Sequence, residues 1–174
     1  MSTRANIIIK EKGSYTDNNG KQKNYSEKLY FYRHSDGYPE GTMPLLVTFI
    51  NAMREGKIRN NVGQSAGWLI MLGAVEYNSI PKFELEPHAV GRRAYGDVTT
   101  TKFSEEDFSG WKVGAIEPTT GIHGDIEYKY VIDVKTMDIT CYERRGNWNK
   151  PKWVKTPIIN IAGYKPHKFK GYFK

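Results

Sequence analysis

The residues YFYRHSDGYPEG, at positions 30–41, form the clearest transition from strand to turn in the chain, and the rest of the fold is interpreted from them. The aromatic run at their start favours a β-strand. The glycines and the proline that follow predict a shaped turn, because glycine permits backbone angles closed to other residues and proline fixes its own φ. His34 and Asp36 lie in this turn. They indicate either a functional site or a tight connection in which both side chains only satisfy backbone groups.

Two strands are predicted in the first 33 residues. Residues 4–11 contain three consecutive isoleucines, and such a β-branched run is typical of a buried strand. Residues 28–33 form the second strand and lead into the turn. The polar residues 13–23 between them contain asparagines and a glycine that tolerate positive φ. We therefore expect a hairpin with a long, mobile loop at its tip.

Two helices are predicted after the turn. Thr42 is placed to cap the first helix and Gly56 to end it, while Asn60 or Asn61 is placed to cap the second. Small residues in the second helix predict a close approach by a sheet or another helix. The apolar positions that recur at helical spacing are Leu45, Leu46, Phe49, Ile50 and Met53 in the first helix, and Val62, Ala66, Leu69, Ile70, Gly73, Ala74 and Tyr77 in the second.

A late hairpin is the strongest β signal. Apolar and polar residues alternate from 126 to 134, a turn follows at 135–138, and residues 139–143 form the return strand. With the elements above, this predicts an α+β fold: an antiparallel sheet made from the early and late hairpins, with two helices packed on one face. The 174 residues are long enough for a core of their own, so we expect one domain spanning 1–174.

Charge is unevenly distributed along the chain. The net charge is +7, and residues 144–174 contain nine basic residues and no Asp or Glu, which leaves 17 basic and 19 acidic residues elsewhere.

The only cysteine, Cys141, excludes an intramolecular disulfide and a cysteine-based zinc site. The sequence begins without a recognisable signal peptide and has no run of about eighteen apolar residues. We therefore expect a cytoplasmic protein that does not span a membrane.

Two turns combine histidine with carboxylates. His34 and Asp36 belong to the first, and His123, Asp125 and Glu127 belong to the second, which opens the late hairpin. If these turns converge, His34, Asp36, His123 and Asp125 form a candidate catalytic site. Such a site suits acid–base chemistry in a phosphodiesterase or nuclease, or a divalent metal. The alternative is that both turns are purely structural.

The basic aromatic segment 144–174 indicates a different activity. Lys and Arg attract phosphates, and interleaved aromatic rings offer stacking surfaces for bases, so this segment predicts binding of nucleic acid or a nucleotide. Alternatively, its aromatic residues cover the sheet or anchor a protein partner. The candidate ligand contacts are Tyr38, Glu127, Arg144, Arg145, Trp148, Lys150, Lys152 and Trp153.

The chain resembles a family of small uncharacterised proteins of bacteriophages and related mobile elements. The resemblance rests on residues 2–5, on the Tyr-x-His-x-Asp-Gly-Tyr-Pro-x-Gly motif within 32–41, and on residues 123–128. It extends to about residue 142, and it assigns no catalytic or binding residue. It implies a phage-encoded accessory protein that counters host defence by binding a protein complex, or by sequestering or degrading a nucleotide signal. We therefore expect a nucleic-acid or nucleotide binder, with a phosphodiesterase or nuclease and an inhibitor of a host defence protein as alternatives.

Overall fold

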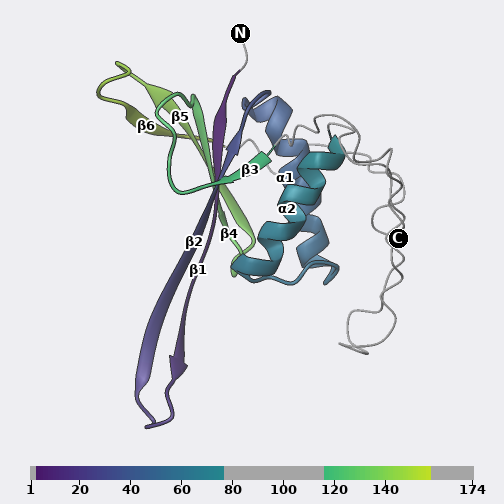
Figure 1. Ribbon diagram of the computed structural model, residues 1–174, viewed down its shortest axis with the longest axis vertical. Coiled ribbons are helices and arrows are strands. Elements are labelled where there is room, and N and C mark those ends of the chain that lie inside the picture. Colours follow the sequence, from purple (N-terminus) through teal and green to yellow (C-terminus); the bar gives the residue numbers. More distant parts are fainter. Residues whose placement is uncertain (1–2, 77–115, 158–174) are drawn as a thin grey trace.

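The computed structural model describes residues 3–76 and 116–157, in which six strands form one sheet accompanied by two helices (Figure 1). This arrangement confirms the α+β prediction. No helix within these residues is long and apolar enough to cross a membrane. The strands are β1 (Ala5–Thr16), β2 (Gln22–Arg33), β3 (Ile116–Thr119), β4 (Tyr128–Asp133), β5 (Asp138–Arg145) and β6 (Lys152–Thr156), and the helices are α1 (Pro39–Arg54) and α2 (Val62–Glu76).

The sheet is mixed, whereas the sequence predicted an antiparallel one. Its spatial order is β3-β2-β1-β4-β5-β6. The early hairpin β1–β2 and the late hairpin β4–β5 are both antiparallel, as predicted, but β1 and β4 pair in parallel, with Ala5 opposite Tyr128. The reason is the route of the chain, which crosses back over the sheet after β3 and enters β4 from the same end as β1. Hydrophobic alternation along a strand does not reveal this direction.

The core lies between the sheet and the helices. Alternate residues of β1 are completely buried, and they join residues of α1 and α2 in one hydrophobic cluster. Figure 1 shows both helices on the same side of the sheet. The sheet contributes Ala5, Ile7, Ile9, Phe31, Ile116, Tyr130, Ile132, Ile139 and Cys141 to the cluster, and α1 contributes all five of its predicted apolar positions, Leu45, Leu46, Phe49, Ile50 and Met53.

The start of α1 differs from the prediction, because the helix begins at Pro39 and not after Thr42. Proline suits the first helical position, where a backbone N–H is not needed. Thr42 is buried inside the helix, and its hydroxyl donates to the carbonyl of Asp36 at 2.9 Å. Thr42 therefore ties the helix back to the turn that precedes it.

The start of α2 and one of its glycines agree with the predictions. The Asn61 side chain accepts a hydrogen bond from the backbone N–H of Gln64 at 2.8 Å, as an N-cap does. A Cβ atom at Gly73 would lie 3.0 Å from the side chain of Ile116, so the helix does approach the sheet closely there. Of the predicted apolar positions, Tyr77 lies outside the described residues.

The early hairpin is longer than predicted. Residues 13–23 were expected to form a mobile loop, but β1 and β2 stay paired from Thr16 opposite Gln22 onward, and only residues 17–21 form the turn. In the described sheet, residues 11–27 pair only with each other and form an arm that projects from the sheet (Figure 1). Most residues of this arm are exposed. They therefore lack the apolar alternation by which a strand is recognised in a sequence.

Candidate functional site

The connection between β3 and β4 crosses the sheet on the face opposite the helices (Figure 1). We call residues 120–127 the crossover loop. The backbone N–H of His123 donates to Oδ1 of Asn6 at 2.8 Å, and Nδ2 of Asn6 donates to the carbonyl of Phe31 at 2.8 Å. Asn6 is completely buried. A polar side chain in the middle of an apolar strand thus fastens the crossover loop to both β1 and β2.

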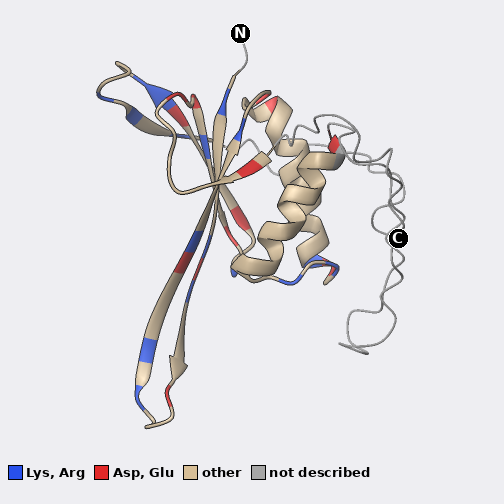
Figure 2. Ribbon diagram, in the orientation of Figure 1, with Lys and Arg blue, Asp and Glu red and all other residues tan. Residues whose placement is uncertain are grey.

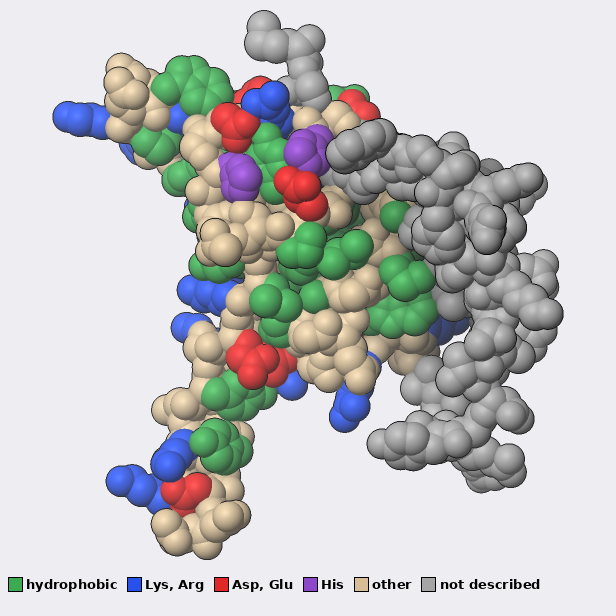
Figure 3. Space-filling model, in the orientation of Figure 1, with side chains coloured by type: hydrophobic (Ala, Val, Ile, Leu, Met, Phe, Trp, Pro, Cys, Tyr) green, Lys and Arg blue, Asp and Glu red, His purple; other side chains and the backbone are tan. Residues whose placement is uncertain are grey.

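Three rings meet at this loop: Tyr32 from β2, His34 from the first turn and His123 from the crossover loop itself. The ring centroid of Tyr32 lies 4.6 Å from that of His34, edge to face, and 4.2 Å from that of His123, stacked. Nε2 of His34 lies 3.0 Å from Oε1 of Glu117, and Nε2 of His123 lies 2.7 Å from Oγ1 of Thr119. The two histidines, purple in Figure 3, lie close together on the surface. We call these five residues the histidine cluster.

A carboxylate at the edge of the histidine cluster holds the tyrosine hydroxyl. Oδ2 of Asp125 accepts hydrogen bonds from the Tyr32 hydroxyl at 2.9 Å and from the Arg4 guanidinium at 2.5 Å. Burial works to raise the pKa of Asp125, but the hydrogen bonds from Tyr32 and Arg4 outweigh it, and the pKa is lowered. Burial and the neighbouring carboxylate raise the pKa of Tyr32 to about 12. At neutral pH the neutral tyrosine hydroxyl therefore donates a hydrogen bond to an ionised aspartate.

The other predicted residues of the two turns are placed differently. Asp36 has a φ of 52°, and its backbone carbonyl accepts from Arg33 and Thr42, so it shapes the first turn through its main chain. Glu127 contributes its backbone N–H, which donates to the carbonyl of Arg4. Tyr38 is the N-cap residue of α1 and is exposed. Of the five residues expected to converge, the structure thus brings His34, His123 and Asp125 together around Tyr32.

A buried arginine that sequence reasoning missed supports the first turn. Arg33 is only 1% exposed, and its guanidinium bonds both carboxylate oxygens of Glu76, at 2.7 and 3.2 Å. The same guanidinium donates to the backbone carbonyls of Asp36 and Gly41. In the sequence, the only indication of this role is the position of an arginine at the end of an aromatic run. Its partner, at the end of α2, could not be found without the fold.

A second cluster lies further along the same face of the sheet. The ammonium of Lys129 lies 4.8 Å from the ring centroid of Tyr142 and 4.6 Å from that of Trp153. Burial lowers the pKa of Lys129, and the two rings favour its cation. We call these three residues the aromatic cluster. A row of cross-strand neighbours connects it to the histidine cluster: Glu117, Tyr32, Asn6, Lys129, Tyr142 and Lys155.

The basic residues of the last hairpin are used in two ways. The Arg144 guanidinium donates to the carbonyls of Gly124 at 2.7 Å, Ile126 at 3.2 Å and Trp148 at 2.7 Å, and it lies 3.7 Å from the ring centroid of Trp148. It therefore holds the crossover loop to the β5–β6 turn, a role different from the predicted phosphate contact. Arg145 pairs with Glu143, whereas the predicted contacts Trp148, Lys150 and Lys152 are exposed.

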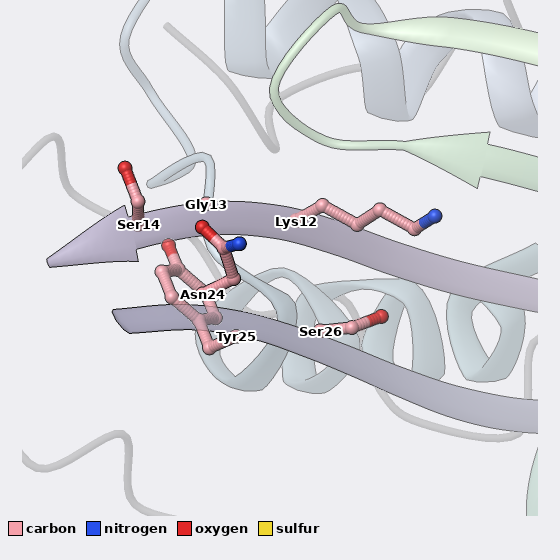
Figure 4. A pocket seen from close by; sticks show the side chains of 6 residues that line it. All are labelled: Lys12, Gly13, Ser14, Asn24, Tyr25 and Ser26. Carbon is pink, nitrogen blue, oxygen red and sulfur yellow. The ribbon is translucent and has the colours of Figure 1, made fainter. Parts of the chain in front are cut away.

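A shallow pocket on the arm is separate from these clusters. Figure 4 shows that it is lined from both strands of the arm, where the ring of Tyr25 lies across Gly13. Tyr25 is seven residues from Tyr32 along β2, or about 23 Å at the usual rise per residue. The pocket therefore does not belong to the histidine cluster. Its lining residues are Lys12, Gly13, Ser14, Asn24, Tyr25 and Ser26.

The metal alternative finds no support in the described part of the chain. Among residues 3–76 and 116–157, no group of three or more His, Cys, Asp or Glu side chains is arranged to hold a metal ion. In the histidine cluster, each imidazole Nε2 instead faces a side chain of β3. The arrangement therefore suits hydrogen bonding and proton transfer.

Comparisons of the chain with protein-family models, curated proteins and solved structures give no significant match. The resemblance to bacteriophage proteins therefore remains a prediction from the sequence. The function has to be argued from the histidine cluster, the aromatic cluster and the charges around them.

Proposed function

We propose that the protein binds nucleic acid or a nucleotide on the sheet face that carries both clusters. The observation that supports this proposal is the aromatic cluster, in which the Lys129 ammonium lies over the rings of Tyr142 and Trp153. The same cross-strand row leads from Tyr142 to Tyr32, which is itself buried in the histidine cluster. Three strand spacings separate these two tyrosines, or about 14 Å. Aromatic rings beside cations are the surface on which bases stack while phosphates are attracted.

The distribution of charge supports the same face. Figure 2 shows Lys and Arg on several strands of the sheet, whereas the helices carry few charges. In α1 the only basic residue of the last turn is Arg54, and α2 has none there. Lys129 on β4 and Lys155 on β6 lie in the same cross-strand row as Tyr142, whereas Lys152, three residues from Lys155, lies on the opposite face of β6. A polyanion would therefore meet cations and a stacking surface together.

The biological setting is part of the proposal. The resemblance to bacteriophage proteins suggests an accessory protein that acts in the host cell, and nucleic-acid or nucleotide ligands are the signals that such a protein would sequester or degrade. The net charge of +7 favours association with these anions. Counter-defence is therefore the role that we propose for this binding surface.

The binding test uses fluorescence polarisation with labelled single-stranded oligonucleotides and cyclic nucleotides at low salt. Lys129→Met should weaken binding and reduce the salt dependence by about one phosphate contact. Trp148→Ala should weaken binding by about 1 to 3 kcal/mol if a base stacks there. Lys57→Met is the matched control, because Lys57 lies between the two helices and pairs with Glu55. Absence of binding by the wild-type protein at low salt would refute the proposal.

Inhibition of a host defence protein is the second candidate. The observation that favours it is the edge of the described sheet, where β6 is the last strand and where Trp148 and Val154 are 60% and 41% exposed. Exposed strand edges accept a strand from a partner. A Val154→Lys variant should then lose a complex recovered from host cells while it retains nucleic-acid binding. Retention of the complex by this variant would exclude the edge as its binding site.

A further inference from the structure

We propose that the histidine cluster cleaves single-stranded RNA, with the ribose 2′-hydroxyl as the nucleophile and the two imidazoles as the acid–base pair. This inference rests on the proposed nucleic-acid binding and names its substrate and reaction. The observation that carries it is the position of His34 and His123, which both contact the ring of Tyr32 although they come from turns 89 residues apart in the sequence.

Strand β3 orients both imidazoles. Glu117 and Thr119 are two residues apart on β3, so their side chains lie on the same face of the sheet. Oε1 of Glu117 lies 3.0 Å from Nε2 of His34, and Oγ1 of Thr119 lies 2.7 Å from Nε2 of His123. The scheme uses the tautomer of His123 in which Nε2–H donates to Thr119 and Nδ1 carries the lone pair. It assigns His123 as the base and His34, which lies beside the Glu117 carboxylate, as the acid.

The reaction is balanced without a further reactant. His123 takes the proton of the 2′-hydroxyl, and the 2′-oxygen forms a bond to the adjacent phosphorus. The bond from phosphorus to the 5′-oxygen breaks, and His34 gives its proton to that leaving oxygen. The products are a 2′,3′-cyclic phosphate and a free 5′-hydroxyl. DNA lacks the 2′-hydroxyl, so the substrate is RNA.

The charges around the histidine cluster require one imidazole to be protonated during the reaction. His34 faces Glu117 from β3, while His123 lies beside Tyr32, whose hydroxyl is held by Asp125 and Arg4. Two carboxylates repel a phosphate, and Arg4 offsets only one of them. A protonated imidazole is therefore needed both to attract the phosphate and to supply the leaving group with a proton. Because the other imidazole must be neutral, the rate should depend on pH with a bell shape.

Tyr32 is a positioning residue in this scheme, because its ring sets the separation of the two imidazoles while its hydroxyl is held by Asp125. Tyr32→Phe keeps the ring and should retain most of the cleavage rate. Tyr32→Leu removes the stacking surface and should flatten or shift the pH profile in addition to lowering the rate. An unchanged profile in Tyr32→Leu would show that the ring does not position the imidazoles.

The decisive experiment compares three oligonucleotides of one sequence: RNA, 2′-O-methyl RNA and DNA, each measured for binding by polarisation and for cleavage by gel electrophoresis. All three should bind, and only RNA should be cleaved, leaving a 2′,3′-cyclic phosphate. His34→Gln and His123→Gln should each lower the cleavage rate by at least about 100-fold while binding changes little. Circular dichroism checks that both variants are folded, and Lys57→Met should cleave at the wild-type rate.

Each other outcome overturns a specific claim. Binding of RNA without cleavage overturns this inference and leaves the proposed function standing, whereas absence of binding overturns the proposed function as well. Cleavage of DNA or of 2′-O-methyl RNA overturns the role of the 2′-hydroxyl. Cleavage that persists in the double variant His34→Gln/His123→Gln, purified in the same way, overturns the assignment to the histidine cluster.

Discussion

The turns at residues 34–36 and 123–125 share the pattern His-x-Asp, yet the structure uses their aspartates differently. In both turns the imidazole contacts the ring of Tyr32. Asp125 accepts hydrogen bonds from side chains, whereas Asp36 contributes its backbone carbonyl from a left-handed conformation. The same short motif therefore places an imidazole in the same cluster twice, but the role of the carboxylate depends on what the fold brings beside it.

The two turns also differ in how they are anchored. The first is held from inside by Arg33, which is buried with Glu76. In the second, Asn6 and Arg144 bind the backbone, and the aspartate is held from outside by Arg4, which is 47% exposed. An ion pair inside a protein cannot lose one partner without leaving an uncompensated charge, while an exposed pair is screened by water. The first turn should therefore depend far more strongly on Arg33 than the second depends on Arg4.

The largest effect is expected for Arg33→Met. This change keeps most of the side-chain volume but leaves Glu76 without its buried partner and removes the donors to two backbone carbonyls. The free energy of unfolding, measured by chemical denaturation, should fall by about 3 to 5 kcal/mol. The double variant Arg33→Met/Glu76→Gln is the control and should recover part of the loss. A loss below about 1 kcal/mol in the single variant would show that the pair does not anchor the turn.

The second-largest loss of stability is expected when a glycine of the first turn, and not one of the second, is replaced by alanine. A Cβ atom at Gly37 would lie 2.7 to 2.9 Å from backbone and Cβ atoms of Arg4 and Ala5, whereas a Cβ at Gly124 would meet nothing within 4 Å. Gly37→Ala should therefore destabilise the protein by about 1 to 3 kcal/mol, as overpacking does, because the neighbouring backbone cannot move freely. Gly124→Ala, its matched control, should change stability by less than about 0.5 kcal/mol. Equal effects would contradict the comparison.

Local patterns predicted the elements of the fold better than their connections. The alternation from Ile126 to Val134 predicted a strand and the helical spacing of Leu45 to Met53 predicted a helix, and both elements were found. The parallel pairing of β1 with β4 was not predicted, since the direction of a neighbouring strand is set by the path of the chain. The arm was missed for another reason: its exposed residues have no apolar period.

The candidate site was partly visible in the sequence. Tyr32 and His34 are two residues apart, at the end of the predicted strand and just after it, and His123 lies in a turn marked by glycines. Glu117 and Thr119 gave no signal, because β3 is only four residues long and carries a proline. Asn6 was equally hidden: a single polar residue in an apolar strand indicates a buried hydrogen bond but not the loop that it holds.

Replacing the two aspartates by asparagine should have different, and smaller, effects on stability. Asp125→Asn removes the charge that pairs with Arg4 and weakens the bond from Tyr32; because the side chain is 44% exposed, the expected loss is about 1 kcal/mol. Asp36→Asn should be neutral, since asparagine tolerates a positive φ. The folded-state pKa of Asp125 is lowered, so its contribution is present above the pKa of the unfolded chain and is lost as the pH falls through the folded-state pKa.

Denaturation at neutral and acidic pH tests this sign. The difference in unfolding free energy between wild-type protein and Asp125→Asn should shrink as the pH falls, because protonation removes the same charge as the substitution does. Asp36→Asn should show no such convergence. A difference that grows toward acidic pH would mean that the hydrogen bonds from Tyr32 and Arg4 do not stabilise the ionised carboxylate.

The smallest effect is expected for Arg4→Met, which removes the exposed partner of Asp125. Its hydrogen bond is short, but both side chains are nearly half exposed, so the loss should stay below about 1 kcal/mol. Salt should screen the pair, and the difference from wild type should therefore nearly vanish in about 1 M sodium chloride, where the Debye length is about 3 Å. Arg33→Met should keep its effect in the same salt, because that pair is buried. If salt weakened both effects equally, the contrast between an inner and an outer anchor would be wrong, and the two turns would be held by the same kind of interaction.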